Sequence, residues 1–211
     1  LEGDVGATIA GSITLDGGRR VTLKGLTVTS TSGHGVLVTD AGSATIQDCQ
    51  FVNNGLYGVV VLNSSFARLV GNQFIGNGLV DTTASGVLIN RNSGAFGEGN
   101  IYSNNAFAGV ELFANGIYRG HLETVTKGSA SLAVAVSADG LSHLDLRGST
   151  VTGNASVSNQ SRLRVQRLGP PDTGTLSTLD GTVSVSGLSS ARVPPGVACN
   201  AGSPSYCQFG Q

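Results

Sequence analysis

Seven ionisable residues gather between residues 91 and 127 of a sequence in which only 12% of residues are charged. A carboxyl group and a histidine can transfer protons near neutral pH, and Arg or Lys can hold a substrate carboxylate in place. The sequence therefore predicts a site for proton abstraction next to the carboxylate of a uronate sugar. Its candidate catalytic residues are Glu111, His121, Arg91 and Lys127, and its candidate substrate-binding residues are Glu98, Arg119 and Tyr102. The alternative interpretation is that these charges only solvate turns.

Metal-ligating and redox-active residues are few. His121 and His143 are 22 residues apart and could lie one above the other in a repeating fold, but no Cys or further His accompanies them. A structural zinc site normally needs four such ligands, so we predict no metal site, and the sequence suggests no cofactor. Cys49 is predicted to be a buried, unpaired thiol at a turn and not a nucleophile, because no histidine is placed to activate it.

Two further cysteines, Cys199 and Cys207, bracket the segment CNAGSPSYC. We predict a disulfide that closes this short loop, which would stabilise the fold by roughly 2–3 kcal/mol. Disulfides persist in oxidising compartments. The predicted localisation is therefore secreted, cell-surface or periplasmic.

These residues must be positioned by a repeat. The segment GHGVLVTDAGSATIQDCQFVNNG (33–55) is followed by LYGVVVLNSSFARLVGNQFIGNG (56–78), and the two match position by position. The matched pairs, each 23 residues apart, are Val36 and Val59, Ile46 and Leu69, Phe51 and Phe74, and Asn54 and Asn77. A period of this length is typical of solenoid folds.

Further copies follow. A third copy begins at Val87 after an insertion around residues 80–84, and later copies begin at Val110 and Val134. Aligning Phe96 with Leu69 predicts that Ile46, Leu69 and Phe96 stack in one column. The same alignment predicts a ladder of turn asparagines formed by Asn54, Asn77, Asn104 and Asn154.

Each copy contains three short alternating segments separated by Gly, Asn, Asp and Ser, which predicts three strands and their turns. Strands one copy apart would pair in parallel about 4.8 Å apart, and stacking buries the apolar residues that a single copy leaves exposed. We predict an all-β, single-domain parallel β-helix of about seven to eight coils. Its expected parts are an N-terminal cap (1–11), the β-helix (12–193) and a C-terminal tail with the disulfide loop (194–211).

The pattern G-V-x-V, then Ile or Leu, then x-F and x-x-N, seen in GVVVLNSSFARLVGNQFIGN (58–77), resembles the right-handed parallel β-helix repeat of the pectate lyase-like superfamily. The resemblance covers about residues 12–165. Pectate lyases, polygalacturonases, alginate epimerases and lyases, and phage tailspikes share this repeat. The resemblance implies a right-handed helix, a location outside the cytoplasm and a groove for acidic polysaccharides along one sheet. It does not imply an activity, because the repeated residues belong to the core and turns.

The catalytic motifs of these families are missing from the sequence. Polygalacturonases combine an Asn-Thr-Asp segment, an Asp-Asp pair, a Gly-His-Gly and an Arg-Ile-Lys, of which only Gly33-His34-Gly35 is present here. The Asp-Pro-His-Glu segment of alginate epimerases and the acidic Ca²⁺ cluster and Arg base of pectate lyases are also missing. Acid-catalysed glycoside cleavage needs two carboxyl groups. We therefore interpret His34 as a turn residue.

One outward sheet face is unusually apolar. Alternation places five large apolar residues there, with Glu111 among them: Leu37, Val60, Leu62, Leu88 and Phe113. A solvated sheet face normally carries polar residues, and exposed apolar patches commonly mark a partner surface. We predict that this face is a homo-oligomer contact. The alternative is that the C-terminal tail folds back over it.

Composition limits the remaining functions. The net charge of −1 gives no reason to expect nucleic acid as a partner, and no run of about 20 apolar residues predicts membrane insertion. The sequence as a whole predicts an extracytoplasmic β-helix module that binds or processes polysaccharide; as an enzyme it would be a polysaccharide lyase, epimerase or glycoside hydrolase. The alternative is a non-catalytic structural or oligomerising module of a surface or phage-like assembly, with a second copy as its partner.

Overall fold

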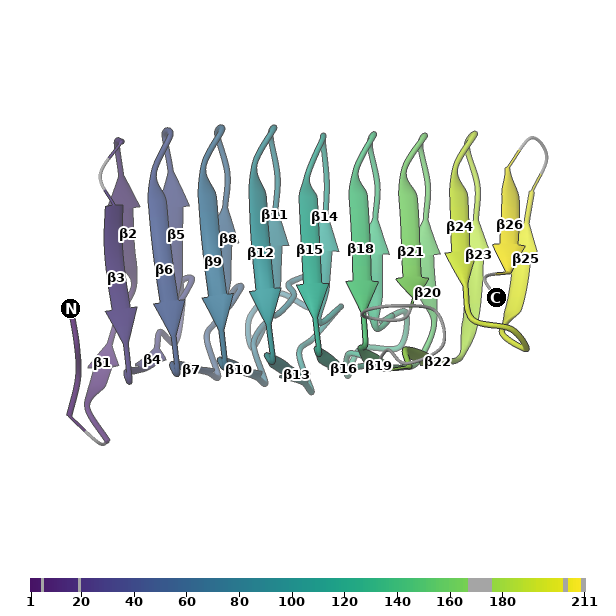
Figure 1. Ribbon diagram of the computed structural model, residues 1–211. Helices are drawn as coiled ribbons and strands as arrows, with labels where there is room; N and C mark the ends of the chain where they lie inside the picture. Colours follow the sequence, from purple (N-terminus) through teal and green to yellow (C-terminus); the bar gives the residue numbers. More distant parts are fainter. Residues whose placement is uncertain (5, 19, 167–175, 203–204, 210–211) are drawn as a thin grey trace.

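The fold is a stack of short coils, each of which passes through three parallel sheets (Figure 1). A computed structural model describes residues 1–4, 6–18, 20–166, 176–202 and 205–209. The described residues contain strands and turns but no α-helix. No segment among them could therefore cross a membrane as a long apolar helix.

We name the three sheets A, B and C. Sheet C opens each coil and contains β2 (Ile13–Asp16), β5 (Val36–Thr39), β8 (Val59–Val61), β11 (Val87–Ile89), β14 (Val110–Leu112), β17 (Val136–Ala138), β20 (Ala155–Val157), β23 (Thr182–Val185) and β25 (Ala198–Ala201). Sheet A follows with β3 (Arg20–Lys24), β6 (Ser43–Gln47), β9 (Phe66–Val70), β12 (Gly94–Glu98), β15 (Ile117–His121), β18 (His143–Arg147), β21 (Arg162–Gln166), β24 (Ser190–Val193) and β26 (Tyr206–Phe209). Sheet B contains β1 (Thr8–Ala10), β4 (Thr27–Thr29), β7 (Gln50–Val52), β10 (Gln73–Ile75), β13 (Ile101–Ser103), β16 (Thr124–Thr126), β19 (Thr150–Thr152) and β22 (Thr178–Asp180).

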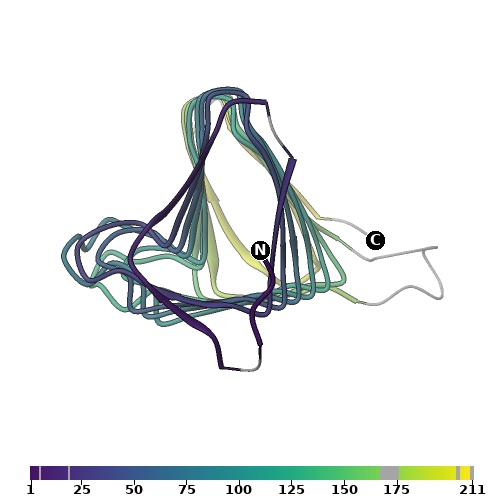
Figure 2. The same ribbon diagram turned by 90° about the vertical axis from the view of Figure 1, so that its left-hand side faces the viewer.

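The sheets form the three walls of a triangular tube (Figure 2). Each strand pairs in parallel with its equivalent in the next coil, as Val36 pairs with Val59 and Val59 with Val87. The connections from sheet B to sheet C are long between β4 and β17, with the longest at 76–86 and 127–135, and they project outward from one corner (left in Figure 2). The predicted all-β, single-domain parallel β-helix of about seven to eight coils is confirmed.

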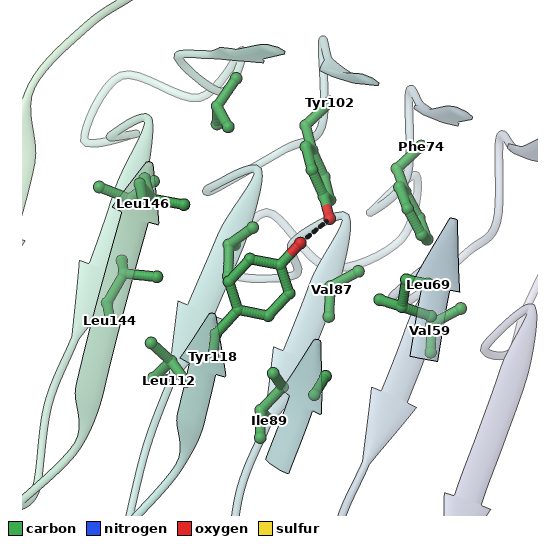
Figure 3. Close-up of a cluster of buried hydrophobic side chains, with 14 of the residues drawn as sticks. Val59, Leu69, Phe74, Val87, Ile89, Tyr102, Leu112, Tyr118, Leu144 and Leu146 are labelled. Atoms are coloured by element: carbon green, nitrogen blue, oxygen red, sulfur yellow. Dashed lines mark hydrogen bonds between the residues drawn. The ribbon is translucent and has the colours of Figure 1, made fainter. Parts of the chain in front are cut away.

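The interior of the tube is filled by columns of equivalent side chains (Figure 3). The rings of Phe51 and Phe74 stack with centroids 5.1 Å apart, and those of Phe74 and Tyr102 with centroids 4.8 Å apart. The predicted stacking of Ile46 on Leu69 is also present. A fully buried side chain of this size stabilises the fold by about 1.5–3 kcal/mol, so the columns supply a continuous core.

The third copy departs from the predicted register by one residue. Leu69 pairs with Gly97, while Phe96 pairs with Arg68 and points outward, so the expected column through Phe96 is wrong. Tyr102, expected to bind substrate, pairs with Phe74 and is completely buried. The insertion adds five residues, so equivalent positions in this copy lie 28 residues after those of the preceding copy, as Gly97 does after Leu69. The sequence alignment matched Leu69 with Phe96 because both are large and apolar, and it was therefore one residue short.

The asparagine ladder shows the same one-residue shift. Asn54 donates to Asn77 at 2.7 Å, and Asn77 donates to Asn105 at 2.8 Å. Asn104, the expected member, instead takes a left-handed turn conformation with φ of 55°. Asn154 accepts a hydrogen bond from the backbone of Thr182 at 3.0 Å, two coils beyond the ladder.

A second polar ladder lines the corner between sheets A and B. The Asn72 side chain accepts from the backbone N–H of Cys49 at 3.0 Å and donates to the carbonyl oxygen of Ile46 at 2.8 Å. Its backbone N–H donates in turn to Asn100 at 2.9 Å. Because a buried backbone group without a partner is costly, this ladder lets the chain turn inside the stack.

We expect Asn72→Ala to destabilise the protein by about 2–4 kcal/mol, since it leaves backbone groups at Cys49 and Ile46 buried without partners. Urea unfolding followed by circular dichroism measures the change. Gln50→Ala, at an exposed position of β7, serves as the control and is expected within about 0.5 kcal/mol of wild type. Equal stability of the two variants would contradict a structural role for the ladder.

The C-terminal segment, expected to be a tail, contains two more strands. Cys199 in β25 pairs with Val183, and Cys207 in β26 pairs with Ala191, so both cysteines occupy core columns. Cys199 and Cys207 form the predicted disulfide, which joins sheets C and A across the last coil. At the other end of the tube, β1 begins sheet B by pairing with β4. The end segments are thus built into the sheets.

Candidate functional site

The four candidate catalytic residues do not share one groove. Glu111 lies on β14 of sheet C, and His121 ends β15 of sheet A. Arg91 occupies the corner between these sheets with φ of 53°, and Lys127 follows β16 of sheet B. The four residues are therefore spread over the three walls and one corner of the tube. Their closeness in sequence reflects one coil of the helix, which carries the chain around all three walls.

Three of the predicted site residues, Glu98, Arg119 and His121, do share the outer face of sheet A. Glu98 and His121 are neighbours across β12 and β15, and Glu98 forms an ion pair with Arg68 at 3.5 Å. The ring of His121 packs edge-on against Phe96, with centroids 5.0 Å apart. Arg119 is the next outward-pointing residue before His121 on β15. This group forms a mixed aromatic and charged surface in the middle of sheet A.

Glu123 is the one residue of the charged stretch that was not predicted to belong to the site. It points into the tube and is only 1% exposed. It accepts hydrogen bonds at 3.2 Å from both the backbone and the side chain of Asn100. The hydroxyl groups of Tyr118 and Tyr102 are 2.7 Å apart in the same region (Figure 3). Burial raises the pKa of Glu123 to about 8, against a usual value of 4.5, so this carboxyl carries a proton at neutral pH.

The raised pKa of Glu123 predicts a loss of stability with rising pH. The folded protein holds this proton more tightly than the unfolded chain, so the free energy of unfolding falls between about pH 4.5 and pH 8. Glu123→Gln should remove this part of the slope. Urea unfolding from pH 5 to pH 8 measures it, with Asp16→Asn, at an exposed position of β2, as control. Parallel curves for wild type and Glu123→Gln would contradict the prediction.

The later strands of sheet A carry outward arginines that sequence reasoning did not select. Arg162 and Arg164 lie on β21, and Arg164 is the direct neighbour of Arg192 on β24. They line a shallow groove of about 140 Å³ together with Ser190, Tyr206 and Gln208. Two features of the sequence could have identified them. Arg162 and Arg164 alternate with apolar residues and so point outward, and Arg192 occupies the position equivalent to Arg164 in the next coil.

Little negative charge opposes these arginines. Asp145, the neighbour of Arg164 on β18, binds Arg147 at 2.8 Å and accepts a hydrogen bond from Gln166 at 3.3 Å. The pKa of His143 is lowered, first by burial and then by Arg162 and Arg164, so His143 reports the same positive field. A second arginine-lined groove of about 240 Å³, at the N-terminal end of the sheet, contains Arg20, Thr22, Phe66 and Arg68.

The apolar face predicted on sheet C is partly covered. Val60 is 1% exposed, whereas Phe113 is 46% exposed, and Leu37, Leu62 and Leu88 are partly buried. Glu111 accepts a hydrogen bond from Ser85 at 2.8 Å, which brings the inserted connection between β10 and β11 against this face. The alternative in which the C-terminal tail covers the face does not hold, because β25 and β26 extend sheets C and A.

The remaining cysteine, Cys49, is buried and unpaired. Its pKa is raised, mainly by burial, which favours the unreactive thiol. Within the residues that the structure describes, no group of three or more His, Cys, Asp or Glu side chains could hold a metal ion.

Comparison with known proteins gives one match. A family model described as a right-handed β-helix region matches residues 11–167. Neither the curated proteins nor the solved structures provide a match for this chain. The match covers the coils from β2 through β21.

Proposed function

This chain belongs to the right-handed β-helix family, and from that premise we propose that it is an extracytoplasmic module that binds an acidic polysaccharide along sheet A. One observation carries the proposal: Arg162, Arg164 and Arg192 line one groove on the outer face of this sheet. The planar guanidinium group binds carboxylates through two parallel hydrogen bonds, which suits a uronate chain.

The regular spacing of the coils also suits a polysaccharide chain. Neighbouring strands of sheet A are about 4.8 Å apart, so outward residues recur at a spacing on the scale of one monosaccharide. Arg119, Arg164 and Arg192 occupy the same row, with Asp145 between the first two. Since Arg147 neutralises Asp145, the row presents net positive charge to a ligand that carries one negative charge per sugar.

Binding is favoured over turnover on this face. Although Glu98 and His121 are neighbours, Glu98 is engaged by Arg68 and His121 packs against Phe96, and no hydrogen bond or ion pair joins the two in the described structure. The disulfide between Cys199 and Cys207 supports the extracytoplasmic location, because such bonds persist in oxidising compartments.

Replacing two arginines tests the proposal. Arg164→Gln combined with Arg192→Gln should weaken binding of tetragalacturonate by at least about tenfold, because two charge-assisted hydrogen-bond donors are lost. Isothermal titration calorimetry at low salt measures the affinity, and wild-type binding should weaken in 0.5 M salt. Arg91→Gln, in the distant corner between sheets C and A, is the matched control. Wild-type protein that binds no tetragalacturonate at low salt would exclude the proposal.

The alternative function is a structural module that self-associates through the outer face of sheet C. The exposed ring of Phe113, together with the partly exposed Leu62 and Leu88 on the same face, favours it. A face of this kind commonly mediates contacts between proteins.

Light scattering separates the two functions. If the face joins two copies, wild-type protein should have at least twice the mass of one chain, and Phe113→Glu should reduce it to a monomer. Tetragalacturonate binding should not change in this variant. A monomeric wild-type protein at micromolar concentration would rule out self-association.

A further inference from the structure

The outer face of sheet B carries threonines in a repeated pattern. From β4 to β22 the middle residue of each strand is buried in the core, so the first and third residues point outward. The strands β4, β16 and β19 each read Thr-Val-Thr and therefore place both threonines on the outer face. The strand β22 adds Thr178. The face thus differs from that of sheet A, where arginines point outward.

Strand pairing arranges the threonines of the last three strands in a two-dimensional grid. Thr124 pairs with Thr150, which pairs with Thr178, and Thr126 pairs with Thr152. Neighbouring strands are about 4.8 Å apart, and each residue advances a strand by about 3.3 Å, so outward residues of one strand are about 6.6 Å apart. The hydroxyl and methyl groups of these threonines therefore recur at regular intervals in two directions.

The side chains of this grid are accessible and have restricted positions. Thr124, Thr150, Thr152 and Thr178 are exposed. Threonine is branched at Cβ, which restricts its χ1 angle. The hydroxyl of Thr126 also donates to the carbonyl oxygen of Tyr102 on the neighbouring strand, at 3.1 Å. The grid is therefore ordered before any partner binds.

The chemistry of the face excludes two classes of ligand. Asp180 carries the only charge in the strands of sheet B that the structure describes, so an ionic ligand finds no row of opposite charges. The aromatic side chains of these strands, Phe51, Phe74 and Tyr102, are completely buried in the core. The face therefore offers no exposed ring on which a sugar could stack. A neutral partner that forms hydrogen bonds is left.

The size of the face argues against a protein partner. The chain before β1 extends beyond this wall at the N-terminal end of the tube (Figure 1), which leaves the strands from β7 to β22 open. These strands form the lower wall in Figure 2 and change direction little from coil to coil. Six strands of three residues span about 24 Å by about 10 Å, or about 240 Å². A stable protein interface covers about 800 Å² on each partner.

We propose that sheet B binds ice. A water molecule in ice donates and accepts hydrogen bonds, as a threonine hydroxyl does. The oxygen atoms in the surface of hexagonal ice repeat at two intervals close to the two spacings of the threonine grid. The hydroxyls of Thr124, Thr150 and Thr178 take the places of successive oxygens along one direction. The methyl groups contact the lattice without the cost of removing water from a charged group.

The test measures two properties of the full chain in the frozen state: its uptake from solution into slowly growing ice, and its effect on the growth of ice grains during annealing. Wild-type protein should be enriched in the ice and should slow grain growth. Thr150→Lys places a charge in the middle of the grid, where it would have to lose its water against the ice. It should raise the concentration that halves grain growth by at least about tenfold.

Thr14→Lys is the matched control, because it adds the same charge at an exposed strand position on sheet C. It should leave both ice measurements unchanged. Urea unfolding of each variant shows whether it folds as wild type does. Tetragalacturonate binding by sheet A is measured separately, and Thr150→Lys should leave it unchanged.

Three results would overturn the proposal. The first is wild-type protein that growing ice rejects as completely as it rejects an inert globular protein. The second is full activity on ice in folded Thr150→Lys. The third is binding of the wild-type protein to microcrystalline chitin or cellulose without any effect on ice, since a crystalline polysaccharide would then be the partner of this face.

Discussion

The structure depends on the in-register parallel pairing of each coil with the next. Its strands are three to five residues long, and none could hold its shape alone. Pairing satisfies the backbone of the walls, but the corners need other partners. The side chains of Asn72 and Asn100 supply them by binding backbone groups of the preceding coil. The pairing of each coil with the next therefore determines which residues can occupy the corners, as it determines which residues stack in the columns of the core.

The same constraint explains how one coil adjusts to its neighbour. Gly97 stands where the preceding coil has Leu69, and a Cβ there would lie 2.6 Å from Cζ of Tyr118. The missing side chain therefore makes room for the Tyr118 ring, whose hydroxyl meets that of Tyr102. The space left by the missing side chain of Gly97 in one coil is thus filled by the Tyr118 ring of the next coil. The hydrogen bond between the two buried tyrosine hydroxyl groups offsets the cost of burying them.

Outward positions are free of this constraint, so the faces of the tube can differ chemically. Sheet A collects arginines such as Arg164 and Arg192, while sheet B carries the threonines of β16 and β19. A single repeat can thus present a basic face on one wall and an uncharged face on another. In such a fold, the sheet on which an outward residue lies and its position along the strand determine which other residues it can act with.

The 23-residue period by itself determined the parallel coils, the column through Phe51 and Phe74, and the pairing of Asn54 with Asn77, because equivalent inward positions must repeat in every coil. The spacing of Cys199 and Cys207 likewise predicted their disulfide. Only the tertiary structure decided the one-residue shift that buries Tyr102. Two alignments of the third copy with the second bury residues of similar hydrophobicity, and the strand pairing selects the one that places Tyr102 next to Phe74. It also separated Glu111 from His121 and brought Ser85 against Glu111, because a loop outside the period has no repeated partner to fix its position.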